Sequence, residues 1–333
     1  MKKEAKNGKV SRNIYIYIYI FAAVAALLIL GAVGYKGLNA YYKLCGRIDH
    51  IQESTSYIHD SINNIQNSIY YFRDCKYPGT DRYSFDYSWM DENCLIAHGF
   101  GGIDGNQYTN SREALEQSYD KGYRVFECDF QIIDHHIVMM HGNMDEELFQ
   151  TSTAGMTYDE FMKLKIYGKY TVMDLEDVME FMSEHEDAYL MTDSKYTDDA
   201  ESAYAISSLV LEAKKVDPSI LDRVIIQIYD QQMLDSIMKI YPFNSVVYTL
   251  YTSLDSNDQV LNFCAASGIG AVTMPYKRAD TDDEFVKQLD AIGVRSLVHT
   301  LNDKAEMEHF FDIGVDMIYT DFAEPAEFAG RVG

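Results

Sequence analysis

The sequence CLIAHGF at residues 94–100 begins with an apolar run that ends in His98, and a glycine-rich loop follows. The same pattern recurs along the chain, in RVFECDF (124–130), IVMMH (137–141) and AYLMTDSK (188–195). Short apolar runs that end in polar residues are typical of buried strands in a parallel sheet. Neighbouring parallel strands end at one edge of the sheet, so we expect the polar residues that end these runs to converge.

Two of these runs place carboxylates on one face of a strand. Residues i and i+2 of a strand point to the same side, so Glu127 points with Asp129, and Asp193 points with Lys195. Buried like charges repel each other unless a cation lies between them. Three carboxylates form an oxygen cage suited to one divalent cation, Ca²⁺ or Mg²⁺. The predicted metal ligands are therefore Glu127, Asp129 and Asp193.

Two histidines, His98 and His141, end strand-like runs beside this predicted metal site. An isolated histidine at the end of a strand is more often a hydrogen-bonded structural residue than a catalytic one. The nearby carboxylates change that balance, because histidines flanking a cation suit paired roles as general acid and general base. We expect His98 and His141 to be catalytic.

Strand-like runs alternate with helical stretches from residue 94 onward, which predicts a parallel α/β sheet. Eight such units in this length predict a (β/α)₈ TIM barrel. An open doubly wound sheet is the alternative, although no G-x-G-x-x-G motif follows a strand. The longest interruption, residues 131–173, includes a short helix at 157–165 and is expected to shape the substrate pocket. The predicted strands are 94–98, 124–130, 188–195, 224–230, 245–251, 271–275, 296–302 and 317–322, and the helices 111–121, 174–186, 198–215, 231–240, 257–267, 282–292 and 304–313.

The N-terminal region predicts a single-pass membrane anchor. Residues 1–13 form a basic tail, and Ile14 to Tyr35 are 22 residues without a charge, enough to cross a bilayer as a helix. Basic residues before the span predict a cytoplasmic tail and a catalytic domain on the extracellular face of the cell membrane. A cleaved signal peptide is the alternative, although its apolar region is usually shorter.

Residues 36–74 predict a helical stalk. Apolar residues recur there with alternating steps of three and four, from Tyr41 to Phe72, as in a coiled-coil seam. This pattern indicates a homo-oligomer through residues 41–72, and a single helix packed on the catalytic domain is the alternative. Residues 75–93 are interpreted as a linker, and residues 94–333 as the catalytic domain. Whether Cys75 and Cys94 form a disulfide is open.

The overall charge excludes one class of partner. The chain carries 52 acidic against 28 basic Lys and Arg residues, for a formal net charge of −24. Binding to a nucleic-acid backbone requires a basic surface. Nucleic acid is therefore not an expected partner.

Four motifs in this chain together resemble the glycerophosphodiester phosphodiesterase family, which is related to the sphingomyelinase D branch of barrel enzymes. The resemblance covers about residues 94–325. It implies that His98 and His141 form the acid/base pair and that one cation is bound by three carboxylates. It also implies that Lys195 contacts the phosphate and that Asn110 is the turn residue of the substrate site. The motifs are AHGFGGIDGNQYTNSREALEQSYDKGYRVFECDF (97–130), IVMMHGN (137–143), LMTDSK (190–195) and MIYTDF (317–322).

The chain departs from the pattern of the family at several positions. Gly99 stands where the family usually has Arg, and the loop GFGGIDG (99–105) is expected to supply backbone N–H groups to the phosphate instead. Asp193 replaces the usual Glu, as in the sphingomyelinase D branch. His299 stands where the family has Trp and is expected to contact substrate. Further departures and further residues expected near the pocket are Thr109, Gly142, Tyr229, Tyr276 and Asn302.

These observations favour an enzyme that hydrolyses phosphodiesters with a divalent cation and two histidines. The expected substrate is a glycerophosphodiester, a lysophospholipid or a glycerophosphate polymer of the cell envelope, because a membrane anchor raises the local concentration of such substrates. The alternative is a barrel without turnover that acts as a membrane-anchored binding or scaffold protein. Gly99 and Gly142 favour that alternative, whereas the intact histidines and carboxylates favour the enzyme.

Overall fold

The computed structural model describes residues 83–196, 199–281 and 283–331 of the chain. The predicted cytoplasmic tail, the span at 14–35 and the stalk at 36–74 lie outside these residues, as does Cys75. Within the described ranges, no helix combines the length and the apolar character needed to cross a membrane.

Parallel strands close into a barrel in the described part of the chain. Strand β1 (Leu95–Ala97) pairs with β11 (Met317–Thr320) on one side and with β2 (Val125–Ile133) on the other, which closes the ring. The prediction of an eight-stranded parallel α/β barrel is thus confirmed. The other strands of the ring, in order from β2, are β6 (Tyr189–Asp193), β7 (Val224–Ile228), β8 (Ser245–Thr249), β9 (Ala271–Pro275) and β10 (Arg295–His299).

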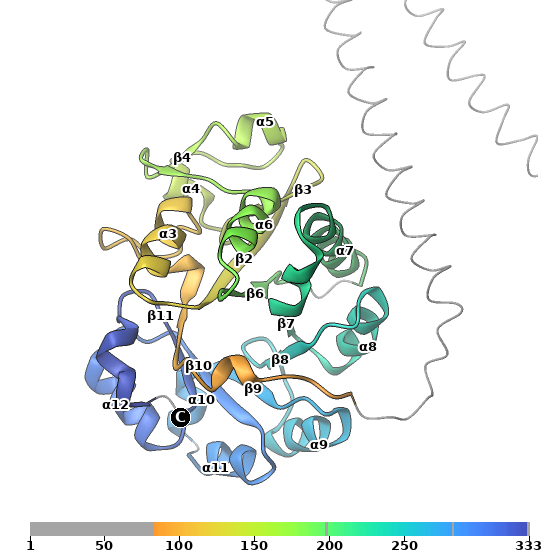
Figure 1. Ribbon diagram of the computed structural model, residues 1–333, viewed down its shortest axis with the longest axis vertical. Helices are drawn as coiled ribbons and strands as arrows, with labels where there is room; N and C mark the ends of the chain where they lie inside the picture. Colours follow the sequence, from red (N-terminus) through yellow and green to blue (C-terminus); the bar gives the residue numbers. More distant parts are fainter. Residues whose placement is uncertain (1–82, 197–198, 282, 332–333) are drawn as a thin grey trace, which may run out of the picture. The chain divides into compact units, whose positions relative to one another are not determined.

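Helices follow the barrel strands and surround them (Figure 1). Most begin where the sequence supplies a capping side chain, such as Ser111, Asp174 or Asp303, that accepts a hydrogen bond from a free backbone N–H of the first turn. The predicted helices between the strands all form, with ends at most two residues from the predicted ones. They are α3 (Arg112–Asp120), α6 (Leu175–Glu184), α7 (Asp199–Val216), α8 (Gln231–Ile240), α9 (Asn257–Ser267), α11 (Asp283–Ala291) and α12 (Lys304–Asp312).

The segment at residues 131–173 contains the end of β2 and the short elements that follow it. Strand β3 (His136–Met139) turns back and pairs antiparallel with the extended end of β2, so it lies outside the barrel ring. The helix expected at 157–165 is shorter than predicted and ends at Phe161. The remaining short elements, including those outside this segment, are α4 (Asp145–Phe149), α5 (Tyr158–Phe161), β4 (Lys165–Ile166), β5 (Tyr170–Thr171), α10 (Tyr276–Thr281) and the 3₁₀ turns η1 (Ser88–Met90), η2 (His98–Phe100), η3 (Pro218–Arg223) and η4 (Pro325–Arg331).

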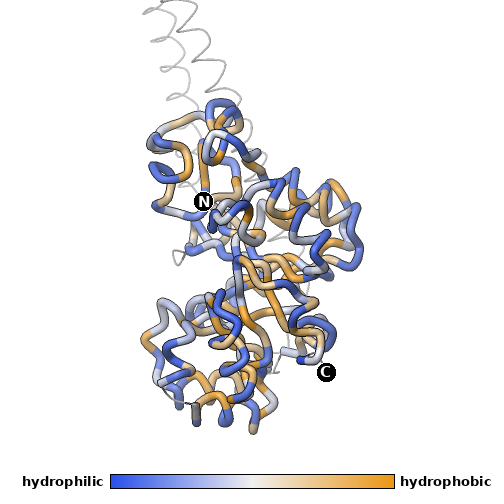
Figure 2. The backbone as a smooth tube through the Cα atoms, turned by 90° about the vertical axis from the view of Figure 1, so that its left-hand side faces the viewer, coloured by the Kyte–Doolittle hydropathy of each residue, from blue (hydrophilic) through white to orange (hydrophobic). Residues whose placement is uncertain are grey.

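The barrel interior is apolar near the N-terminal ends of its strands. Each of the eight strands contributes a buried side chain to one cluster, and side chains of a closed barrel meet in this way only inside the ring. Figure 2 shows the hydrophobic colour along the inner strands, whereas hydrophilic colour is frequent on the outer segments. The strand residues of this cluster are Ile96, Val125, Met191, Ile225, Val247, Ala271, Leu297, Met317 and Tyr319.

Part of the segment interpreted as a linker, 75–93, belongs to the barrel. Trp89 and Met90 are buried in the interior cluster, and the Trp89 indole Nε1–H donates to Ser245 Oγ over 2.9 Å. The Tyr87 hydroxyl donates to the carbonyl of Val246 and accepts from the N–H of Gly270. These aromatic residues close the N-terminal end of the barrel, which explains why an aromatic-rich segment precedes β1. Cys94, just after it, is a buried free thiol.

Candidate active site

Three carboxylates meet at the C-terminal end of the barrel strands, as the strand-end pattern predicts. Glu127 and Asp129 lie on β2, and Asp193 ends β6 directly opposite Asp129 in the register of the two strands. One oxygen from each of the three groups lies within 4.8 Å of the others. Glu127 is 2% exposed and Asp129 1% exposed, so the cluster concentrates negative charge inside the protein.

Neighbouring charges give two of these carboxylates pKa values shifted in opposite directions. Burial and the neighbouring charge of Asp129 raise the pKa of Glu127 to about 8. Burial also acts to raise the pKa of Asp129, but the charges of Lys195, His141 and His98 outweigh it and hold the pKa below its usual value. The buried cluster thus contains one carboxyl group whose pKa is raised and one whose pKa is lowered.

Lys195 is the nearest cation to the cluster. Its ammonium donates to Asp129 and, over 2.7 Å, to Asp193 Oδ2. Burial lowers the pKa of Lys195, but the carboxylates, led by Asp129, raise it overall, so the ammonium stays charged. Its backbone lies in the left-handed region (φ 55°), held there by an N–H bond of 2.8 Å to the Tyr229 hydroxyl. Tyr229 also donates to Asp193 over 2.5 Å.

The residues present fit a divalent cation. All three candidate ligands are carboxylates, which are the oxygen ligands that Ca²⁺ and Mg²⁺ prefer, and they come from rigid strands rather than from loops. Burial and the charge of Asp129 raise the pKa of Glu127, and a cation held between the carboxylates would favour its ionised form.

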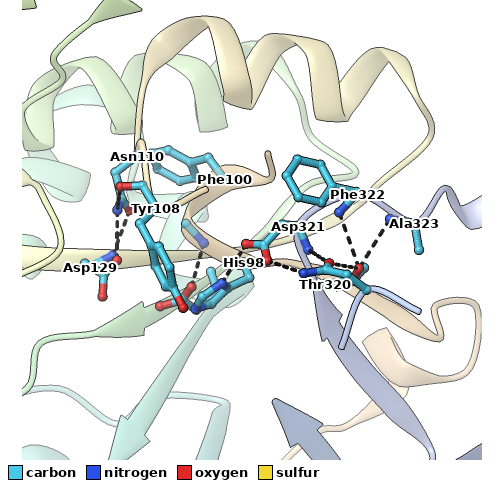
Figure 3. A network of polar contacts seen from close by, with 12 residues as sticks. His98, Phe100, Tyr108, Asn110, Asp129, Thr320, Asp321, Phe322 and Ala323 are labelled. Carbon is cyan, nitrogen blue, oxygen red and sulfur yellow. Dashed lines mark hydrogen bonds and ion pairs between the residues drawn. The ribbon is translucent and has the colours of Figure 1, made fainter. Parts of the chain in front are cut away.

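His98 is held by an acidic partner at the closing strand. Its Nδ1–H donates to Asp321 Oδ1 over 2.9 Å (Figure 3). Asn302 Nδ2 donates to the other oxygen of Asp321 over 2.7 Å. Burial lowers the pKa of His98, but the bond to Asp321 and the charges of Glu127, Asp321 and Asp129 raise it to about 9. His98 is therefore an imidazolium near neutral pH.

The hydrogen-bond partner of His141 is a backbone carbonyl and not a carboxylate. It lies just beyond β3, and its Nδ1 is 2.8 Å from the carbonyl oxygen of Gly142. A carbonyl only accepts hydrogen bonds, so Nδ1 carries the proton. In the neutral ring, the other nitrogen, Nε2, is then left with a free lone pair.

Tyr108 lies between the two histidines. Its ring centroid is 4.9 Å from that of His98 and 4.9 Å from that of His141, in edge-to-face contacts at 79° and 63°. The structure thus brings His98 and His141 together around one aromatic ring, at the mouth of the carboxylate cluster.

The glycine-rich loop after β1 supports the cluster from within. The Gly99 N–H donates to Glu127 Oε2 over 2.8 Å, and the N–H groups of Gly101 and Gly102 donate to the carbonyls of His98 and Asp321. These N–H groups are used inside the protein, so the geometry favours a structural role for them over the expected phosphate contact. Gly99 as a substrate-binding residue stays a prediction.

Asn110 holds one of the carboxylates in place. Its Nδ2 donates to Asp129 Oδ2 over 2.8 Å, and its Oδ1 accepts from the backbone N–H of Asp129 over 3.0 Å (Figure 3). The side chain is fully buried, and its backbone is left-handed, at φ 48°. The geometry therefore favours Asn110 as the residue that orients Asp129, in place of the expected substrate contact.

His299 ends β10 and lies on the other side of the site. Its Nδ1 is 3.1 Å from Thr273 Oγ1, and its ring contacts Tyr251 and Tyr319. Burial, followed by the positive charges of His98 and Lys195, lowers the pKa of His299 to about 3. A neutral imidazole there suits a hydrogen-bonding contact with substrate, which stays a prediction. By contrast, the ring of Tyr276 packs against Phe310 on α12.

Sequence reasoning missed two residues of this site. Asp321 directly follows the last barrel strand in MIYTDF, and the rule that located the other acids, an acid at the end of an apolar run, applies to it equally. Tyr108 carries no such signal, because it lies in a loop and reaches the histidines only through a left-handed backbone at φ 57°.

The comparison with protein families found one match. Residues 102–324 match the Glycerophosphoryl diester phosphodiesterase family, a range that begins just after His98 and Gly99 and includes the carboxylates, His141 and Lys195. A comparison with curated proteins found no match.

Solved structures with the same fold include glycerophosphodiester phosphodiesterases. One from Parabacteroides distasonis is 22% identical, with a TM-score of 0.59 over 73% of this chain and 97% of that one. Another is an Oleispira antarctica phosphodiesterase in complex with the product sn-glycerol-3-phosphate, 17% identical, with a TM-score of 0.59 over 74% of this chain and 98% of that one. The family match covers more than half of the 333 residues, so this chain belongs to the glycerophosphoryl diester phosphodiesterase family and is a phosphodiesterase.

Proposed function

We propose that the protein hydrolyses glycerophosphodiesters with His98 and His141 as its acid/base pair and one divalent cation on Glu127, Asp129 and Asp193. One observation supports this most: both imidazoles flank the buried carboxylate cluster at the C-terminal end of the barrel, where barrel enzymes have their active sites. Family membership supports the reaction class.

The two histidines have different hydrogen-bond partners at Nδ1. His98 is protonated near neutral pH because of its bond to Asp321, so it suits the general acid that protonates the leaving oxygen. His141 has its Nδ1–H bonded to Gly142, which leaves Nε2 to take a proton as the general base. The proton comes from a water molecule or from a substrate hydroxyl adjacent to the phosphate, and the latter gives a cyclic phosphate first.

Negative charge on the phosphoryl oxygens must be neutralised for either route. A bound Ca²⁺ or Mg²⁺ would supply the neutralising positive charge and polarise the phosphorus–oxygen bonds. Lys195 presents its ammonium at the same carboxylates and is placed to contact a phosphoryl oxygen from the protein side. Asn110 and Tyr229 keep Asp129 and Asp193 oriented during turnover.

The substrate class is the finer part of the proposal. The Oleispira antarctica structure contains sn-glycerol-3-phosphate as its product, which supports a glycerophosphodiester here. Lysophospholipids and envelope glycerophosphate polymers share that chemistry. The proposed membrane anchor favours a lipid or envelope substrate within this class, because it raises the local concentration of such substrates.

A direct test is phosphodiesterase activity of the purified full chain on a panel of these substrates, with and without EDTA. We expect release of glycerol 3-phosphate from glycerophosphodiesters and from the polymer, or of lysophosphatidate from lysophospholipids, in the open or the cyclic form. This release should stop in EDTA and return with Ca²⁺ or Mg²⁺. Absence of turnover on every substrate of the panel, with metal present, would favour the binding or scaffold function.

We also propose that residues 14–35 anchor the chain with its catalytic domain on the extracellular face, and that residues 41–72 join copies of the chain. The support is in the sequence: an uncharged stretch preceded by basic residues, and a regular seam rich in isoleucine. Protease added to intact cells should remove the barrel, and protection would reverse the orientation. Sedimentation of a fragment that begins at residue 37 as a monomer would refute the association.

A further inference from the structure

Tyr108 is the one aromatic side chain in the described residues that contacts both proposed catalytic histidines. Its ring meets His98 at 79° and His141 at 63°, with equal centroid distances of 4.9 Å. Edge-to-face contacts of this kind have a preferred direction, so they orient the rings as well as bury them. Figure 3 shows the Tyr108 ring beside the His98 imidazole.

The loop that carries Tyr108 is built to hold it there. Its backbone adopts φ 57°, a region that residues other than glycine enter only when the surroundings hold them. The next residue but one, Asn110, donates its N–H to the Gly99 carbonyl over 3.1 Å and is bonded through its side chain to Asp129. The metal-ligand carboxylate and Tyr108 are therefore fixed by the same short segment.

Gly99 makes this approach possible. A Cβ atom at position 99 would lie 3.3 Å from the Tyr108 Cα, tighter than most contacts of a real Cβ, and Gly99 has a left-handed backbone at φ 54°. A side chain at position 99 would require a left-handed backbone that favours glycine, and the Tyr108 backbone would have to shift by a few tenths of an ångström.

The imidazoles need such support because a hydrogen bond at Nδ1 fixes one ring atom but leaves the ring free to tilt about it. His98 has this bond with Asp321, and His141 has it with Gly142. Contact with the Tyr108 ring restrains the tilt of both rings together, and thereby the direction of each Nε2 atom. A reactive group displaced by about 1 Å can lose on the order of 10²-fold in rate.

We infer that Tyr108 is a positioning residue whose ring, wedged between His98 and His141, sets the separation and the orientation of the acid/base pair. The ring carries this role, because its hydroxyl has no part in restraining the imidazoles. Burial, followed by the charges of Asp321, Asp129 and Glu127, raises the pKa of the Tyr108 hydroxyl, so it remains a neutral phenol. The kinetic consequence rests on the proposed function, whereas the geometric consequence does not.

The test compares Tyr108→Leu, which removes the ring, with Tyr108→Phe, which keeps it. Leucine is not branched at Cβ, so it enters the left-handed backbone no less readily than tyrosine does. With metal saturating, we expect Tyr108→Leu to lower kcat by about 10- to 100-fold with KM within about threefold of wild type, and Tyr108→Phe to keep kcat within about threefold. Tyr241→Leu is the matched control, because Tyr241 packs on Phe243 before β8, at the opposite end of the barrel.

A kcat of Tyr108→Leu within threefold of wild type would overturn the inference. An equal loss in Tyr108→Phe and Tyr108→Leu would also overturn it, because the hydroxyl and not the ring would then matter. Circular dichroism and thermal unfolding of each variant verify that the fold is retained.

A second readout separates this inference from the proposed function. In NMR spectra of histidine-labelled protein, Tyr108→Leu should shift the ring resonances of both His98 and His141, since a neighbouring aromatic ring has been removed, and leave the remote His309 in place. This result would support the geometry even if the wild type were inactive on every glycerophosphodiester. Unchanged resonances for either His98 or His141 would contradict it whatever the activity.

Discussion

The two ends of the barrel interior are built from the same strands and differ in almost every physical respect. At the N-terminal end, side chains such as Val125, Met191 and Ile225 form an apolar cluster that Trp89 closes. Two to four residues further along β2 and β6 stand Glu127, Asp129 and Asp193. Burial of apolar side chains at the N-terminal end stabilises the fold. Burial of carboxylates at the C-terminal end costs free energy, because they lose contact with water and repel one another. The apolar packing at the N-terminal end therefore offsets the cost of burying the carboxylates at the C-terminal end.

The largest effect should come from the C-terminal end of the barrel. We expect His98→Ala and His141→Ala each to fold normally and to lose about 10²- to 10⁴-fold in kcat, the usual contribution of a general acid or base. Steady-state kinetics on a glycerophosphodiester with metal saturating measure this. His309→Ala, on the exposed face of α12, is the control and should keep wild-type turnover. More than a tenth of wild-type kcat in either site variant would mean that the acid/base pair is misassigned.

The N-terminal end of the barrel should respond in stability instead. Ile225 is fully buried within the barrel, so Ile225→Ala removes packed methyl groups and should lower the free energy of unfolding by about 2–5 kcal/mol. Turnover below the melting transition should stay within about threefold of wild type. Denaturant unfolding and kinetics on the same sample measure both quantities. Loss of turnover that exceeds the loss of folded protein would show that the two ends are not separable.

Lys195 should give a smaller loss of turnover than the histidines, since it offers charge and not proton transfer. A hydrogen bond to a charged group contributes about 1.5–3 kcal/mol, so Lys195→Ala should lower kcat/KM by about 10- to 100-fold. Its removal also leaves Asp129 and Asp193 without their ammonium partner. A loss as large as that of His98→Ala would assign Lys195 a part in proton transfer.

His299 should leave the fold in place at neutral pH and affect the dependence of stability on pH. The pKa of His299 is lowered to about 3 in the folded protein and is about 6.5 in an unfolded chain, so below pH 6.5 only the unfolded state binds this proton. The stability that the neutral ring contributes is present above pH 6.5 and is lost as pH falls toward 3. His299→Gln should reduce the dependence on pH between 6 and 4 by about one proton per molecule unfolded. Denaturant unfolding at these pH values measures the change of unfolding free energy with pH. The same change in His299→Gln as in wild type would contradict the buried, neutral ring.

Much of the barrel could be predicted from the sequence because each element has a local signal. Apolar runs such as RVFECDF bury both faces of a strand, and side chains such as Ser111 and Asp174 mark the starts of helices. The part of residues 75–93 that packs into the barrel has no such local signal, because the burial of Trp89 depends on the strands that surround it and not on its neighbours in sequence.

The site divides in the same way. The carboxylates, both histidines and Lys195 follow apolar runs, and the closing of the barrel brings them together. The roles of Asn110 and Gly99 depend on loop geometry, which links them to Asp129 and Glu127 across 19 and 28 residues of sequence. Tyr108 depends on the same geometry. No periodicity reports a positive φ at one tyrosine, so its place between the histidines required the structure.

The central claim is that Glu127, Asp129 and Asp193 bind one divalent cation on which turnover depends. The most direct test is calorimetric titration of metal-free full-length protein with Ca²⁺ and with Mg²⁺, together with an assay of turnover at each step. Glu127→Gln keeps the shape of the side chain and removes its ability to ionise on metal binding. Glu308→Gln, at an exposed ion pair with Arg331, is the matched control. We predict one ion per chain for wild type and for Glu308→Gln, with turnover rising in step with binding, and loss of both in Glu127→Gln. Full turnover in the presence of chelator, or one bound ion and wild-type turnover in Glu127→Gln, would contradict the claim.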